Sequence, residues 1–190
     1  MPAIGWNRIN VAHRAGRYDP CWPSLFEERA MAVTTLLFPF VSEIHHIGST
    51  AVPGLAAKPK IDIDVVVSDQ RMVPELSARL RSAGYTFHGD PYACNLWTFT
   101  ADTRPCGTRL YLCETGNAAH AARLLFPDAL REHQGLARHY DTLKRRLARE
   151  AKGDWDIYTN GKRGFINEVL GTGGNEKGAP LSPAGPSEEL

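Results

Sequence analysis

Two aspartates lie two positions apart in an apolar segment of this sequence. They are Asp62 and Asp64, within the segment Lys60–Val67 (KIDIDVVV). Side chains alternate between the faces of a β-strand, so both carboxylates would project from one face and the neighbouring isoleucines from the other. Carboxylates on so apolar a strand are costly to desolvate without a compensating cation or hydrogen-bond donor. Since Mg²⁺ and Mn²⁺ prefer oxygen ligands, we predict that Asp62 and Asp64 bind one of these metals.

A second polar group precedes these acids, directly after a strand that we predict for residues 42–47. It consists of Gly48, Ser49 and Thr50. A glycine lets the backbone approach a ligand closely, and free backbone N–H groups beside two hydroxyls suit phosphate oxygens. The sequence therefore predicts a phosphate site next to the metal site, a combination typical of nucleotide chemistry.

The spacing of the two groups resembles that of the nucleotidyltransferase superfamily. Ile47-Gly48-Ser49 is followed by residues 50–61 and then by Asp62-Ile63-Asp64-Val65. The longer string HIGSTAVPGLAAKP, followed by IDI, resembles the GrpB family (UPF0157-type), a branch of that superfamily. The resemblance continues through DPCWPSLFEE and YTNGKRGFINEVL, and it covers roughly residues 18–170.

This resemblance implies a metal-dependent nucleotidyltransferase-like enzyme. An acceptor of unknown structure, expected to be a small molecule, would attack the α-phosphorus of a nucleoside triphosphate, and pyrophosphate would leave. Divalent Mg²⁺ or Mn²⁺ on the two acids would neutralise developing charge and orient the attack. The residues expected to hold the phosphates are Gly48, Ser49 and Thr50.

Several basic residues are further candidates for contact with the nucleotide. Lys58 matches the lysine of the family string AAKP, and Lys162 lies in the second matching string. Each is either a nucleotide contact or an ordinary solvated lysine. The basic run 144–146 is typical of a solvated helix face, although Arg145 or Arg146 would reach a triphosphate if that helix closed over the cleft.

One segment departs from the family pattern. Where family members tend to carry His-Leu-His, this sequence reads Arg109-Leu110-Tyr111-Leu112, and no clear third carboxylate follows. Arg109 faces the same way as Tyr111 and is predicted to assist catalysis electrostatically or to contact the acceptor. Two alternatives stay open for the whole chain: a non-catalytic nucleotide- or metabolite-binding module, and a biosynthetic enzyme of different reaction type that reuses the cleft.

The elements that position these residues predict an α+β fold, with a nucleotidyltransferase-like mixed sheet flanked by helices and a helical C-terminal portion. Apolar periodicity, prolines and glycines set the boundaries. Strands are predicted at 42–47, 60–67, 85–88, 96–100 and 108–113. Helices are predicted at 23–38 and 73–83, from 117 to an interruption at Pro127, across 136–151, and at 156–170 with a break near Gly161.

Length and composition fit a globular protein of 190 residues, with a formal net charge of +1, 43% hydrophobic and 23% charged residues. We expect an extended lead-in at 1–20, a single domain at 21–170 and a disordered tail at 171–190, which is rich in Gly and Pro. No apolar run is long enough for a membrane span, and the four cysteines are scattered. We therefore expect a cytoplasmic protein with no membrane partner and no nucleic-acid partner.

Overall fold

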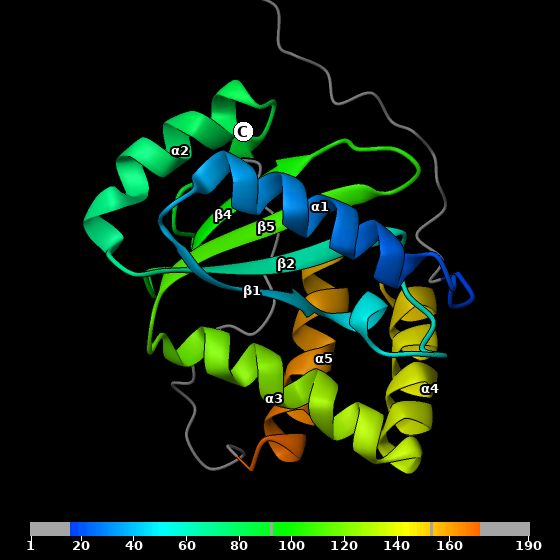
Figure 1. Ribbon diagram of the computed structural model, residues 1–190. Helices are drawn as coiled ribbons and strands as arrows, with labels where there is room; N and C mark the ends of the chain where they lie inside the picture. Colours follow the sequence, from blue (N-terminus) through cyan, green and yellow to red (C-terminus); the bar gives the residue numbers. More distant parts are fainter. Residues whose placement is uncertain (1–15, 92, 153, 172–190) are drawn as a thin grey trace, which may run out of the picture.

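A mixed β-sheet runs through the middle of the protein, with helices on both of its faces (Figure 1). The computed structural model describes residues 16–91, 93–152 and 154–171. The strands are β1 (Val41–Ile47), β2 (Lys60–Val67), β3 (Thr86–Phe87), β4 (Trp97–Ala101) and β5 (Gly107–Glu114). Their order in the sheet is β1-β2-β5-β4-β3, and only the β2–β5 pair is parallel among these strands. The predicted α+β class with a mixed sheet is confirmed.

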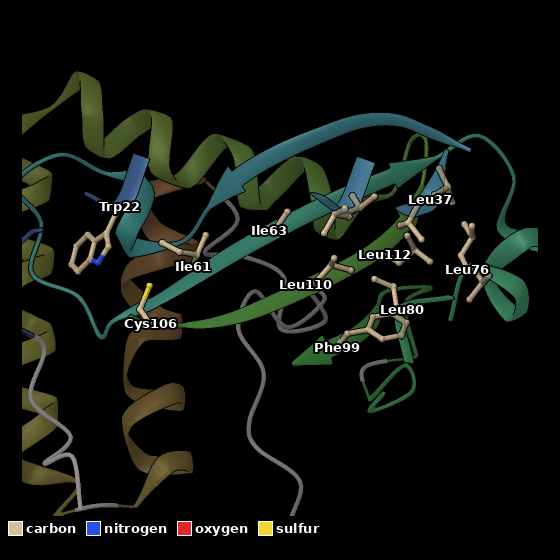
Figure 2. Close-up of a cluster of buried hydrophobic side chains, with 14 of the residues drawn as sticks. Trp22, Leu37, Ile61, Ile63, Leu76, Leu80, Phe99, Cys106, Leu110 and Leu112 are labelled. Atoms are coloured by element: carbon tan, nitrogen blue, oxygen red, sulfur yellow. The ribbon is translucent and has the colours of Figure 1, made fainter. Parts of the chain in front are cut away.

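One face of the sheet is covered by α1 (Trp22–Leu37) and α2 (Val73–Ser82), which lie above it in Figure 1. A large aliphatic core fills the space between these helices and the sheet (Figure 2). Burial of these side chains is the main source of stability on this face. The labelled members in Figure 2 are Trp22, Leu37, Ile61, Ile63, Leu76, Leu80, Phe99, Cys106, Leu110 and Leu112.

The other face is covered by α3 (Ala118–Glu132), α4 (Gln134–Glu150) and α5 (Trp155–Val169). A short 3₁₀ turn, η1 (Ser49–Ala51), leads from β1 toward these helices, and a second one, η2 (Gln70–Met72), precedes α2. Apolar residues of the loop after η1 pack among the three helices, in a cluster of Val52, Leu55, Leu130, Tyr140 and Ile166. The turn after β1 is therefore fixed between the sheet and the helical layer.

Strand β2 is buried on both of its faces. The predicted burial of Ile61, Ile63 and Val65 is confirmed, since none of the three is exposed. Asp64 and Val66 project from the opposite face and are also buried, because α3 and its neighbours cover that face. A strand covered on both sides needs a partner for any charge it carries.

Two predicted helix breaks are wrong. α3 continues through Pro127, which is buried within the helix, and α5 continues through Gly161. The packing explains why residue 161 is a glycine. A Cβ atom there would overlap the side chain of Leu147 on α4. The glycine lets α4 and α5 approach each other closely.

The ends of the chain are described only in part. Gly16 and Ala57 form a backbone bridge with N···O distances of 2.9 and 3.2 Å. Residues 1–15 of the predicted lead-in and 172–190 of the predicted tail lie outside the described residues. Among the described residues, no helix combines the length and apolarity needed to cross a membrane.

The contact at Gly161 predicts opposite effects for two glycines of the same helix. We expect Gly161→Ala to destabilise the protein by about 1–3 kcal/mol, because the added methyl group displaces Leu147 in a packed interface. Gly164→Ala is the matched control. A Cβ atom at Gly164 meets nothing within 4 Å, so alanine should stabilise by about 0.5–1 kcal/mol through its helix propensity. Denaturant unfolding of both variants measures this, and equal shifts of the same sign would contradict it.

Candidate functional site

A pocket lies between the η1 turn, the strands β2 and β5, and the helices α3, α4 and α5. Its charged lining is strongly biased toward cations. Among the residues that line it, Asp62 is the one carboxylate, and the cationic side chains are Lys58, Lys60, Arg109, Arg123, Lys144 and Lys162. Such a concentration of positive charge in a cleft attracts anions.

The turn and the first acid of the sequence motif touch each other in this pocket. Gly48 has a φ of 72°, a left-handed conformation that favours glycine. A Cβ atom at this position would lie 2.8 Å from Oδ2 of Asp62. Gly48 is therefore required both by its backbone conformation and by the close approach of the Asp62 carboxylate.

Asp62 and Arg109 are neighbours in the parallel β2–β5 ladder and face the pocket together. Nε of Arg109 lies 4.0 Å from Oδ1 of Asp62, and Nη1 of Arg109 donates to the Tyr111 hydroxyl at 3.3 Å. Oδ1 of Asp62 is buried and accepts no hydrogen bond within the described part of the chain. This buried oxygen of Asp62 therefore keeps unused hydrogen-bonding capacity.

Asp64, the second acid of the motif, lies beneath α3 and does not line the pocket. Its Oδ1 lies 2.8 Å from Nη2 of Arg123, and its Oδ2 lies 2.9 Å from Nδ1 of His120. The Arg123 guanidinium in turn stacks on the Tyr111 ring, 3.4 Å from its centroid. Arg123 and His120 compensate the buried charge, as the cost of desolvating a carboxylate requires.

The pocket does not fit the two-carboxylate metal site that the sequence predicts. Asp62 offers one carboxylate, and the oxygens of Asp64 are ion-paired with Arg123 at 2.8 Å and lie 2.9 Å from Nδ1 of His120. A divalent cation held by both acids would require Asp64 to leave these partners. Metal binding by the pair stays a prediction.

Lys144 is the most buried cation of the pocket, with 2% of its surface exposed. Its ammonium group donates to the backbone carbonyl of Ala56 and, at 3.3 Å, to Oγ of Ser49. Burial lowers the pKa of Lys144 to about 7, because desolvation penalises the charged form. Lys144 thereby fixes the turn at Ser49 to the loop at Ala56.

Lys58 and Lys162 both lie over the ring of Tyr158, with Nζ atoms 5.1 and 4.5 Å from its centroid. The pKa of each is lowered to about 8, chiefly by burial, and for Lys58 the neighbouring cations contribute to this shift. Both predicted lysines line the same pocket as the predicted turn. Lys60 joins them, its pKa also lowered chiefly by burial.

Of the two hydroxyls at the turn, the one on Thr50 is committed to the protein itself. Thr50 is 2% exposed, and its Oγ1 lies 3.0 Å from Nε2 of His46 and donates to the carbonyl of Lys60 at 3.3 Å. Ser49 is only half-buried, and its hydroxyl accepts from Lys144. Ser49 is therefore better placed than Thr50 to contact a ligand.

The sequence did not predict three residues of this region as site residues: His120, Arg123 and Lys144. The two arginines considered beside Lys144 point elsewhere, since Arg145 pairs with Asp141 and Arg146 with Glu150. A signal for the lysine was present. Lys144 lies four residues after Tyr140 and three before Leu147, so it interrupts an apolar helix face with a charge.

The two acids of the motif should differ in their effect on stability. Asp64→Asn should destabilise by about 3–5 kcal/mol, because it leaves the buried Arg123 without its counter-charge. Asp62→Asn has the same chemistry at a partly exposed position and should cost about 1 kcal/mol or less. Denaturant unfolding of both variants gives the comparison, and an equal loss would show that the Asp64 cluster is no more important to the fold than Asp62.

Comparison with known proteins places these residues in a family. Residues 14–172 match the family described as GrpB protein. The chain is 32% identical over 149 residues to UPF0157 protein YqkA of Bacillus subtilis, covering 78% of this chain and 43% of the relative. It is 38% identical over 155 residues to UPF0157 protein PA4798 of Pseudomonas aeruginosa, covering 80% of this chain and 64% of the relative. The chain therefore spans less than two thirds of the length of these two relatives.

A solved structure agrees with this placement. The crystal structure of the conserved protein GrpB from Enterococcus faecalis superposes with a TM-score of 0.75 at 30% identity, covering 83% of this chain and 94% of that one. The matched residues include the Gly48–Ser49 turn, both acids and all the helices that line the pocket. The chain belongs to the GrpB family.

Proposed function

We propose that the pocket binds the oligophosphate group of a nucleotide, with a nucleoside triphosphate as the expected ligand. The observation that carries this proposal is the charge of the pocket, whose lining holds six cationic side chains and one carboxylate, with one of the six, Arg123, also paired with Asp64. Several of these cations are largely removed from water, at a free-energy cost that an anionic ligand would offset. A triphosphate carries enough negative charge to engage several of them together.

The geometry suits a phosphate group at the Gly48–Ser49 turn. Lys144 donates to the Ser49 hydroxyl of the turn, and Lys58 and Lys162 line the same pocket. Charge-assisted hydrogen bonds from such groups are stronger than neutral ones. The apolar part of the lining would accept the base or another uncharged portion of the ligand; it includes Phe126, Pro127, Leu130, Tyr140 and Ile166.

A second candidate is transfer of a nucleoside monophosphate to an unknown small-molecule acceptor. The position of Asp62 favours it, since this carboxylate faces the pocket beside the turn and has an oxygen that accepts no hydrogen bond from the described residues. An acceptor hydroxyl would lose its proton to Asp62 while its oxygen attacks the α-phosphorus. The bond from that phosphorus to the bridging oxygen would break, and pyrophosphate would leave. Arg109, 4.0 Å from Asp62, would stabilise the charge that develops.

The products that form, or fail to form, distinguish the remaining functional hypotheses. A binding module would hold the nucleotide without releasing pyrophosphate, and an enzyme of another reaction type would turn over a substrate without consuming nucleotide. Mg²⁺ or Mn²⁺ would enter this pocket together with the nucleotide. Asp62 would give such a cation one carboxylate oxygen, so the metal should bind together with the triphosphate rather than alone.

The binding proposal predicts a sharp difference between two adjacent residues of α4. Lys144→Met keeps the side-chain length but removes the buried charge below the turn, so triphosphate affinity should fall at least about tenfold. Arg145→Met is the matched control, because Arg145 is exposed and pairs with Asp141. The triphosphate affinity of Arg145→Met should change less than about twofold, because exposed ion pairs contribute little free energy.

Isothermal titration of a nucleoside triphosphate, with and without Mg²⁺, measures both variants. Lys144→Met should remain folded, since methionine removes a desolvated charge at similar volume. Wild-type affinity in Lys144→Met, or no triphosphate binding by the wild-type protein with any common base, would end the proposal.

The lowered lysine pKa values predict proton uptake on ligand binding. The pKa is about 7 for Lys144 and about 8 for Lys58 and Lys162, and a bound anion raises all three toward the ordinary value. At a pH of about 8 the protein should therefore take up protons when a triphosphate binds, and affinity should fall as the pH rises from about 7 to 8.5. Titrations in buffers of different ionisation enthalpy detect the uptake. A binding enthalpy independent of the buffer would contradict it.

The ligand-free protein should respond to pH in the opposite direction. These lysines bind protons more weakly in the folded than in the unfolded state, so unfolding takes up protons over this range. The free energy of unfolding should therefore rise from pH about 7 to 8.5, and Lys144→Met should flatten that rise.

A further inference from the structure

We propose that Glu43, His45 and His120 form a binding site for a zinc-class metal ion, separate from the pocket. Glu43 and His45 belong to β1, and His120 lies in the first turn of α3. One potential ligand atom from each lies within 4.8 Å of the others. None of the three residues lines the pocket, and this site is independent of the proposed function.

The three side chains already converge. Nε2 of His45 lies 2.8 Å from Oε2 of Glu43, and the rings of His45 and His120 are 5.1 Å apart between centroids. Tetrahedral ligands at zinc-like bond lengths lie roughly 3.3 Å from one another. Small rotations of the two β1 side chains would close that gap, and both have room to move because 53% of Glu43 and 31% of His45 is exposed.

His120 is held in the orientation that a metal ligand needs. Its Nδ1 lies 2.9 Å from Oδ2 of Asp64, so Nδ1 donates to the carboxylate and the lone pair of the other ring nitrogen is left to a metal. Its backbone N–H donates to Oδ1 of Asn117, at 3.0 Å, at the cap of α3. Metal-binding histidines usually donate their second nitrogen to a carboxylate in this way, which fixes the tautomer and raises ligand basicity.

The donor set selects the class of metal. Two imidazoles and one carboxylate match the ligand preference of Zn²⁺, whereas Mg²⁺ prefers oxygen ligands throughout. The exposure of Glu43 and His45 leaves the remaining coordination position facing solvent. Asp64, the second acid of the sequence motif, would then support a metal ligand from behind instead of binding metal itself.

The test uses the full chain, stripped of metal with a chelator, and the variants His45→Asn and Glu43→Gln. Glu43 is exposed and His45 is half-buried, so the variants should fold, and circular dichroism checks that they do. Co²⁺ serves as a spectroscopic probe, and Zn²⁺ affinity is measured by displacing it. His133→Asn is the matched control, since His133 is an exposed histidine at the other end of α3.

The wild-type protein and His133→Asn should bind one Co²⁺ with visible absorption bands of tetrahedral intensity, and Zn²⁺ should displace it while equimolar Mg²⁺ should not. His45→Asn and Glu43→Gln should each weaken Zn²⁺ binding at least about tenfold, by analogy with losses on disturbing metal ligands and their supports. No tetrahedral Co²⁺ spectrum in the wild-type protein, or Zn²⁺ affinity unchanged in both variants, would overturn the proposal.

Discussion

The position of the helical layer follows from the buried charge of Asp64. A carboxylate with no exposed surface must be compensated within the protein, and here the partners are Arg123 and His120 on α3. Residues three apart on a helix share one side, so a single placement of α3 delivers both groups to the acid. That placement seals the second face of the sheet, and α4 and α5 then pack beside α3. The pocket is the space that this arrangement leaves near the Gly48–Ser49 turn.

Much of the fold follows from local patterns in the sequence. The alternation of aspartates and isoleucines in β2 predicts a strand and its buried isoleucine face, and the glycine-serine turn is found beside Asp62 as the motif indicates. The fate of Asp64 does not follow from any local pattern. Its partner His120 is 56 residues away, and nothing near the acid indicates that a distant helix will neutralise it. The two predicted metal ligands therefore lie in different environments, Asp62 in the pocket wall and Asp64 buried beneath α3.

Lys144 is a second residue whose role depends on contacts with segments distant in the sequence. Its place in an apolar helix face is readable from the sequence, but its contacts with Ser49 and Ala56 join segments that are far apart in the chain. The breaks predicted at Pro127 and Gly161 are wrong because tertiary packing overrides helix propensity. In both helices the residue expected to end the helix is instead a packing position. Pro127 lines the pocket, and the missing side chain of Gly161 leaves room for Leu147.

The pocket takes its lining from segments far apart in the chain, from Ile47 at the end of β1 to Ile166 in α5. During synthesis on the ribosome, the Gly48–Ser49 turn and both acids emerge long before Lys162 is made. A nascent chain without α5 therefore lacks the pocket wall formed by Tyr158, Lys162 and Ile166. If the pocket binds a nucleotide as proposed, the site is complete only after α5 has docked, and the bound nucleotide would then protect chains with a docked α5 from proteases.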